Sequence, residues 1–282
     1  MSTTASSSVS PVAVAPKQAL SKERRAKRMR RGTVFGIQAA VLAFFLIVWQ
    51  FVSGTLIHEL MISKPSAVFP LFWSWLVDGT IVSAAGITFG NAALGLLIGG
   101  AMGITVGIVL GQSAWLADIF EPFITAIYTM PKHALIPLFI MWVGIGAQLS
   151  VLTSAVIVFF LIFFNTFFGI RDVKPSLVSS VRIMGGSPLD VLWRVRLPSA
   201  LVWVVAGLKL AVPQAIVGVV VAEMLAGNAG LGFLVSKNAH SFNAAGTYAA
   251  LFTLLIAGYL VDRLMTLLTK KPLEWKNSGS AM

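Results

Sequence analysis

The stretch RDVKPSLVSSVRIMGGSPLDVLWRVRLP, residues 171–198, is a long polar interruption between two strongly apolar segments. It holds five basic residues against two acidic ones. The pair Gly185-Gly186 predicts a break between two short helices. Ser187 is suited to cap the second helix, and Asp190 three residues later completes a capping-box pattern. The sequence therefore predicts a polar pair of helices that joins two apolar segments.

The pattern of this helix pair is compatible with two roles. Leu189, Leu192 and Trp193 share one face of the second helix. A short amphipathic helix at a membrane surface can dock into a groove of a partner protein. The same residues would also suit an ordinary loop that lies on lipid headgroups, and the pattern alone leaves both roles open.

The composition places the chain in a membrane. Hydrophobic residues make up 57% of its 282 residues and charged residues 11%, whereas a soluble globular domain carries about 25% charged residues. We therefore expect an all-α fold, a polytopic bundle of about six transmembrane helices in the cell (inner or plasma) membrane. Cysteine is absent, which excludes disulfides and cysteine metal sites, and the three histidines show no metal-ligand spacing.

The positive charge is concentrated in three regions. The net charge is +11, and of the 21 Lys and Arg residues eight lie in 17–31, five in 171–198 and four after residue 262. Nucleic-acid binding could explain a basic chain, but these charges flank apolar spans. The positive-inside rule explains them better and predicts that both termini are cytoplasmic. The first basic run would also be attracted to anionic membrane lipid, and no nucleic-acid partner is expected.

Apolar segments divide the chain into three parts. We expect a disordered, basic cytoplasmic tail at 1–32, a transmembrane domain at 33–268 and a cytoplasmic C-terminal tail at 269–282. A cleavable signal peptide is the rival interpretation of the first apolar segment, but that segment is about 20 residues long and no small-residue cleavage site closes it. A Gly/Asn-rich stretch at 226–244 is expected to form an external re-entrant or surface loop. The six spans are expected at about 33–53, 82–111, 122–146, 149–170, 199–225 and 245–268.

Glycine recurs every four residues in the second expected span. Such a stripe of small residues lets the backbone of another helix approach closely. We therefore assign it to helix packing and not to a pore. The stripe consists of Gly95, Gly99, Gly103, Gly107 and Gly111.

Three ionisable residues are candidates for a pathway or gate. Lys132 and His133 lie between Pro131 and Pro137, which should kink the third span. Ionisable side chains at membrane depth are costly unless they face protein, water or the interface. Glu223 lies near the outer end of the fifth span. The alternatives are a lysine that snorkels to the interface or pairs within the bundle, and a structural hydrogen bond at Glu223.

The spacing within 171–198 resembles a known family. Ser179-Ser180-Val181, then Gly185, then Val195 and Leu197-Pro198 is similar to the "EAA" loop of bacterial ABC importer permeases, with Ser-Ser-Val in place of Glu-Ala-Ala. Two further stretches, at 131–146 and 221–235, resemble the nitrate/sulfonate/taurine-type branch. The resemblance covers roughly residues 60–270 and implies a type I importer permease (MetI-like) fold.

In that family this loop is the coupling helix that docks onto the ATPase subunit. The resemblance implies that Ser179, Ser180, Val181, Gly185, Gly186, Leu197 and Pro198 contact the ATPase. It implies two permease copies forming a homodimer, two ATPases and one extracytoplasmic solute-binding protein. ATP and magnesium would be bound by the ATPase, so no cofactor is expected in this chain. Substrates of this branch include nitrate, sulfonates, taurine and pyrimidine precursors of vitamins.

Motifs of self-contained catalysis are absent from the sequence. It contains no GxxxxGK[ST] phosphate loop, no HExxH and no GxSxG. We therefore expect a non-enzymatic subunit that gates by rigid-body motion driven from outside the chain. Two alternatives remain. A self-contained secondary transporter or channel would be expected to show an inverted repeat and charged pairs at the midplane. A membrane scaffold that anchors a soluble enzyme would explain the loop but not the kinked, glycine-striped helices.

Overall fold

The computed structural model describes the backbone of residues 17–277 and the side chains of residues 32–267. Over this range the regular elements are helices, with one isolated bridge between Ser53 and Ile57. The chain divides into two compact units, one ending at Ile57 and the other beginning at His58. Five described helices are long and apolar enough to cross a membrane, or six when one bent pair is taken as a single span. The expected all-α membrane bundle is confirmed.

The first unit is dominated by helix α1 (Lys17–Val52). Its segment Gly32–Val52 is long and apolar enough to cross a membrane, as expected for the first span. Residues 17–32 are helical, which differs from the disordered tail expected at 1–32. The Lys, Arg, Glu and Ala residues of this segment favour helix, and extending an existing helix is easier than nucleating one. The remainder of that tail, 1–16, and the last residues of the expected C-terminal tail, 278–282, lie outside the described residues.

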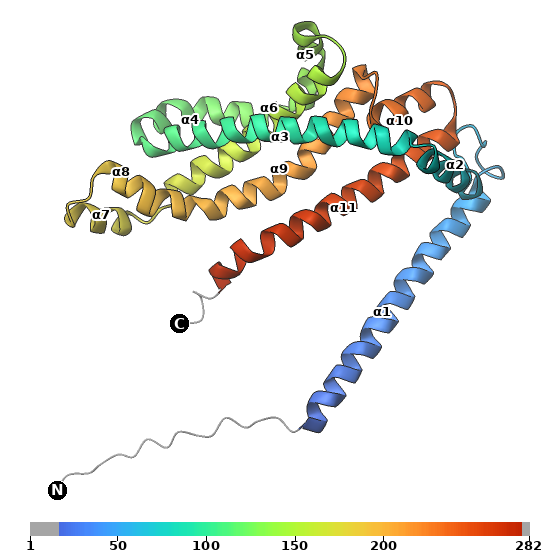
Figure 1. Ribbon diagram of the computed structural model, residues 1–282, viewed down its shortest axis with the longest axis horizontal. Coiled ribbons are helices and arrows are strands. Elements are labelled where there is room, and N and C mark those ends of the chain that lie inside the picture. Colours follow the sequence, from blue (N-terminus) through green and yellow to red (C-terminus); the bar gives the residue numbers. More distant parts are fainter. Residues whose placement is uncertain (1–16, 278–282) are drawn as a thin grey trace. The chain divides into compact units, whose positions relative to one another are not determined.

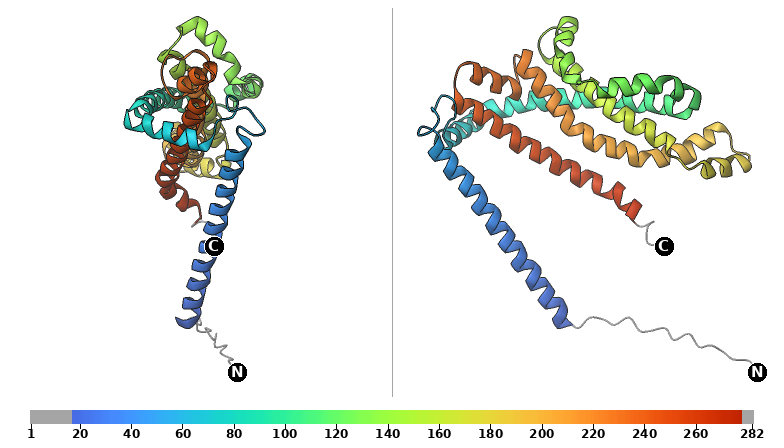
Figure 2. Two further views of the ribbon diagram at one scale, coloured as in Figure 1. Left: turned by 90° about the vertical axis from the view of Figure 1, so that its right-hand side faces the viewer. Right: turned by 180° about the vertical axis from the view of Figure 1, so that it is seen from behind.

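Three long helices form the core of the second unit. Helices α3 (Thr80–Gln112), α6 (Ala147–Arg171) and α9 (Leu197–Ala226) lie side by side in Figures 1 and 2. Their bounds agree with the expected second, fourth and fifth spans to within a few residues. A buried apolar cluster joins the three helices and consists of Ala92, Val158, Ile162, Ala211, Ala215 and Val219.

The glycine stripe of α3 lies against α6. A Cβ atom at Gly103 would lie 2.8 Å from the carbonyl oxygen of Phe159, and one at Gly111 would lie 2.9 Å from the Cβ of Ile170. At Gly99 an added Cβ would collide with the backbone of Ala155. The two backbones therefore meet at a distance that only glycine permits.

The expected third span is a broken helix. Helix α4 (Ala114–Thr129) is followed by the short 3-10 helix η1 (Lys132–Leu135) and by α5 (Ile136–Val143), and the two parts are bent by 86°. Met130 is extended, with ψ 133°, because the following proline disfavours helical backbone. Pro131 therefore ends α4, whereas Pro137 lies at the start of α5 and does not kink it. Helix α4 begins directly after Ser113, eight residues before the expected start of the third span at about 122.

Helices α2 (Pro65–Val77) and α10 (Leu231–His240) lie at the other end of the core from α4 (Figure 1). Helix α11 (Ala244–Asn277) starts at that same end and runs back toward the opposite one. The rings of Phe69 and Phe72 each pack edge-on against Phe252 of α11, with centroids 5.3 Å apart. The loop expected at 226–244 is largely helix α10. The glycines that suggested a loop cluster at the start of this stretch. The apolar residues Leu231 and Val235 that follow are buried and stabilise the helix.

Candidate functional site

The 171–198 loop contains the two predicted short helices. Helix α7 (Pro175–Ile183) and helix α8 (Pro188–Val191) are separated at Gly185-Gly186. Gly185 adopts φ 81°, a conformation that favours glycine. At Gly186 an added Cβ would lie 2.8 Å from the carbonyl oxygen of Val181, which accepts a hydrogen bond from the Gly186 amide. The first glycine is needed for its backbone angle and the second for its lack of a side chain.

The predicted capping box is confirmed. The Ser187 hydroxyl accepts a hydrogen bond from the Asp190 amide at 3.2 Å. In return the Asp190 carboxylate accepts one from the Ser187 amide at 3.0 Å. Asp190 also pairs with Arg194 at 3.2 Å. These contacts fix the direction in which α8 leaves the glycine break.

The 171–198 loop exposes several large apolar side chains. Ile183 and Met184 are each 86% exposed, and Leu189 and Trp193 are 66% and 67% exposed. Val191, by contrast, is buried and anchors α8 to the bundle. Apolar side chains exposed in this number on a short polar segment indicate a surface that another molecule covers.

The residues that the family resemblance selects lie on both halves of this loop. Ser179 and Ser180 are exposed on α7, and the Ser180 hydroxyl donates to the Ser176 carbonyl within the helix. Val181 is half-buried against Gly186. Leu197 and Pro198 begin α9, at some distance along the chain from α7.

A rigid connection joins the loop to the bundle. Helix α8 continues through a π-helical turn, η2 (Leu192–Arg196), directly into α9. The Arg196 guanidinium donates to the carbonyl oxygen of Gln112 at 2.9 Å, and so satisfies one of the free carbonyls at the end of α3. No local pattern predicts this contact, because 84 residues separate the two partners in the sequence.

Lys132 and His133 line a cavity of about 440 Å³ between α4, η1, α6 and α9. A second cavity of about 460 Å³ shares two of its lining residues, Tyr128 and Leu210, and is also lined by Asn165 and Trp203. The other lining residues of the first cavity are Tyr128, Ile157, Phe160, Leu161, Leu210 and Gln214.

The two ionisable residues of this cavity differ in their contacts. The Lys132 ammonium donates to the Tyr128 carbonyl oxygen at 2.7 Å and lies 5.3 Å and 5.6 Å from the ring centroids of Tyr128 and Phe160. His133 Nε2 is buried and has no hydrogen-bond partner within the described part of the chain. The structure thus brings these two predicted residues together on a shared cavity wall.

Glu223 lies apart from that cavity. Its side chain is 2% exposed, and its carboxylate accepts hydrogen bonds from the Thr88 hydroxyl at 2.9 Å and from the Gly232 amide at 2.9 Å. Glu223 does not line either of the two cavities described above. Its contacts are those of the structural alternative, a buried polar group that joins α9 to α3 and α10.

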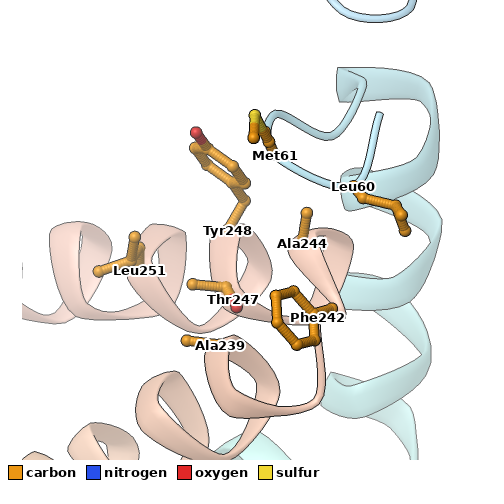
Figure 3. A pocket seen from close by; sticks show the side chains of 8 residues that line it. All are labelled: Leu60, Met61, Ala239, Phe242, Ala244, Thr247, Tyr248 and Leu251. Atoms are coloured by element: carbon orange, nitrogen blue, oxygen red, sulfur yellow. The ribbon is translucent and has the colours of Figure 1, made fainter. Parts of the chain in front are cut away.

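A smaller pocket of about 270 Å³ lies at the α10–α11 end of the second unit. Figure 3 shows its lining side chains, which come from the segment before α2, the end of α10 and the start of α11. Phe242, in the turn between α10 and α11, adopts φ 55°, which is uncommon for a residue other than glycine. The sequence did not single out this pocket, because its residues are dispersed and mostly apolar.

Comparison with known proteins agrees with this geometry. Residues 99–273 match the family described as "Binding-protein-dependent transport system inner membrane component". The chain is 29% identical over 252 residues to the putative aliphatic sulfonates transport permease protein SsuC of Bacillus subtilis, covering 89% of this chain and 91% of that protein. It is 26% identical to the taurine transport system permease protein TauC of Escherichia coli, covering 85% and 89% of the two chains.

A third relative is the formylaminopyrimidine transport permease protein ThiX of Halalkalibacterium halodurans, 28% identical over 67% of this chain and 76% of that protein. Among solved structures, an inward-facing conformation of the MetNI methionine ABC transporter matches with a TM-score of 0.56. It shares 20% identity and covers 72% of this chain and 98% of the matched chain. The expected MetI-like permease fold is confirmed.

Proposed function

The chain belongs to the family of binding-protein-dependent transport system inner membrane components, and from this premise we propose that its 171–198 loop receives a separate ATPase subunit. The chain is a permease component of an ABC importer. In the proposed complex two copies of it form the solute pathway, two ATPases lie on the cytoplasmic side and one solute-binding protein docks outside. Both termini are cytoplasmic in this arrangement, as the distribution of Lys and Arg indicates.

The observation that carries the proposal is the combination of exposure and rigidity in the 171–198 loop. Ile183 and Met184 are the most exposed large apolar side chains of the loop. Helix α8 continues through η2 into α9 without a break, so one continuous helical segment connects that exposed surface to the core. ATP-driven movement of a docked subunit would therefore be transmitted to α9 as a rigid-body displacement and not absorbed by a flexible linker.

The substrate proposed here is a small sulfonate or a related solute of similar size, such as taurine. The support for this substrate class comes from the relatives SsuC and TauC, which are named for the transport of aliphatic sulfonates and of taurine. Nitrate and pyrimidine precursors are the alternatives within this branch, and ThiX is named for the latter. A screen of the co-purifying or genetically neighbouring solute-binding protein against these three classes separates them.

The first test is affinity purification of the full chain from its own membranes in mild detergent, followed by mass spectrometry. Recovery of an ATPase that carries a phosphate-loop motif is the expected result. Repeated recovery of the chain alone in several detergents would overturn the proposal and favour a self-contained secondary transporter.

The second test addresses the loop itself. Gly185→Leu forces a side chain onto a left-handed backbone, and should uncouple ATP hydrolysis from solute uptake while the protein still inserts. Gly79→Leu is the matched control, since Gly79 has a similar φ of 83° on a left-handed backbone and both positions have open space around an added Cβ. Unimpaired uptake with Gly185→Leu would count decisively against docking at this loop.

A further inference from the structure

The cavity at Lys132 lies near the middle of the membrane-spanning helices. Ile157, Phe160 and Leu161 are close to the midpoint of α6, and Leu210 and Gln214 are close to the midpoint of α9. The broken helix α4–η1–α5 supplies Lys132 and His133 at its break. In secondary transporters, solute sites are typically formed at this depth by discontinuous helices.

The polar groups of this cavity have unused hydrogen-bonding capacity. The Lys132 ammonium has three N–H donors, and one of them donates a hydrogen bond to the Tyr128 carbonyl oxygen. The buried Nε2 of His133 has no partner among the described residues, which is costly for a polar atom away from water. The Gln214 side chain is exposed on the surface of the single chain, close to the midpoint of α9. A polar amide at that depth would be costly if it faced lipid. These three groups converge on one space.

The charge of the cavity and the side chains that form its walls indicate which class of ligand it could bind. Among the described residues that line it, Lys132 carries the charge and none is acidic. The remaining walls are the aliphatic side chains Ile157, Leu161 and Leu210 and the ring of Phe160. A volume of about 440 Å³ is within the range of small-molecule sites. The matching ligand has a compact anionic head with several acceptor oxygens and a short apolar tail.

We propose that the cavity lined by Lys132, His133 and Gln214 is a transient binding site for a small organic oxyanion, a sulfonate or a carboxylate, on its way through the permease. This inference rests on the proposed function, because it places the site in the solute pathway. The Lys132 ammonium pairs with the head group, Gln214 donates to it, and the aliphatic walls hold the tail. Selection by the permease then adds to selection by the solute-binding protein.

The test measures binding to the full chain in lipid nanodiscs, with its co-purified ATPase and without any solute-binding protein. The probe is butane-1-sulfonate, and the comparison compounds are butyl methyl sulfone, which is neutral, and butyltrimethylammonium, which is cationic. Calorimetric titration should detect the sulfonate and neither comparison compound. Lys132→Met, which keeps an unbranched side chain one atom shorter and removes its charge, should weaken sulfonate binding by roughly tenfold, or about 1.4 kcal/mol.

Two variants control for structural damage. Lys132→Arg keeps the charge and should bind within about threefold of the original protein, since charge-assisted hydrogen bonds to the head group persist. Lys209→Met removes the other lysine of the spans, which is exposed on α9 and does not line this cavity, and should change nothing. Monodisperse elution of each variant shows that it is folded.

Three results would overturn the inference: absence of sulfonate binding to the original protein, equal binding of the neutral sulfone, or unchanged binding to Lys132→Met. The proposed function fails separately, through absence of an ATPase in the purified complex. Binding to the chain alone in nanodiscs can still be measured in that event. The two failures are therefore distinguishable.

Discussion

The Thr88 hydroxyl lies 2.9 Å from the Glu223 carboxylate and donates a hydrogen bond to it, although 135 residues separate the two in the sequence. The same hydroxyl oxygen accepts a hydrogen bond from the Leu231 amide at 2.8 Å. Thr88 lies on α3, Glu223 on α9 and Leu231 at the start of α10. One buried hydroxyl thus connects three helices at the end of the core where α10 lies.

Thr88→Val should destabilise this junction. The substitution keeps the shape of the side chain but leaves the Leu231 amide without an acceptor and removes a donor from Glu223. Loss of a partner from buried polar groups costs about 1–3 kcal/mol, so the melting temperature should fall by on the order of 5 °C. Thermal unfolding of the detergent-solubilised protein measures this shift.

Thr105→Val is the matched control for that experiment. Thr105 lies on the same helix, and its exposed hydroxyl donates to the Ala101 carbonyl within α3. Its loss should change the melting temperature little. Equal shifts for the two variants would show that the connection to Glu223 contributes nothing specific.

Gly99→Ala should disrupt the packing of α3 on α6. An added Cβ would collide with the backbone of Ala155, which cannot move aside as a side-chain end could. Overpacking of this kind costs about 1–3 kcal/mol, and we expect a lower yield of folded protein and a lower melting temperature. Gly90→Ala on the same helix has open space around its added Cβ and should be neutral or slightly stabilising. A similar loss for both would show that the collision with the α6 backbone is not responsible.

The spans could be predicted from the sequence because hydropathy and proline act locally. The expected spans at 82–111, 149–170 and 199–225 each lie within two residues of α3, α6 and α9. The kink at Pro131 was also predicted, although as a bend and not as a break of 86°. Each of these features depends on residues close to one another in the chain.

The contacts between distant polar residues could not be predicted in the same way. Periodicity shows that Glu223 is embedded, but it does not reveal that Thr88 and Gly232 are its donors. The Arg196–Gln112 contact could not be predicted either, because its two partners are also far apart in the sequence. Helix α10 was missed because its glycines suggested a loop, whereas its stability comes from tertiary burial of Leu231 and Val235.

Ser187→Ala should loosen the start of α8. The capping box loses the hydroxyl that accepts from the Asp190 amide, and removal of such a cap costs about 1 kcal/mol. Hydrogen exchange of the amides of residues 189–191 should accelerate by roughly fivefold, since about 1 kcal/mol corresponds to that factor. Ser187→Asp provides another capping oxygen and should restore protection. Persistent fast exchange in Ser187→Asp would indicate that the cap is not what orders this helix.

Met184→Ser should weaken attachment of the ATPase while leaving the permease folded. Met184 is 86% exposed in the 171–198 loop, so its removal costs the bundle no packing, whereas a docked partner would bury it. A fully buried methionine contributes about 1.5–3 kcal/mol, so the affinity for the ATPase should fall by about tenfold or more. Met141→Ser is the matched control, because Met141 is 82% exposed on α5, outside the loop. Titration of the purified ATPase onto nanodiscs that contain each variant measures the difference. If the two variants bind the ATPase equally well, the exposed apolar residues of the 171–198 loop face lipid, and the docking surface must be sought elsewhere on the permease.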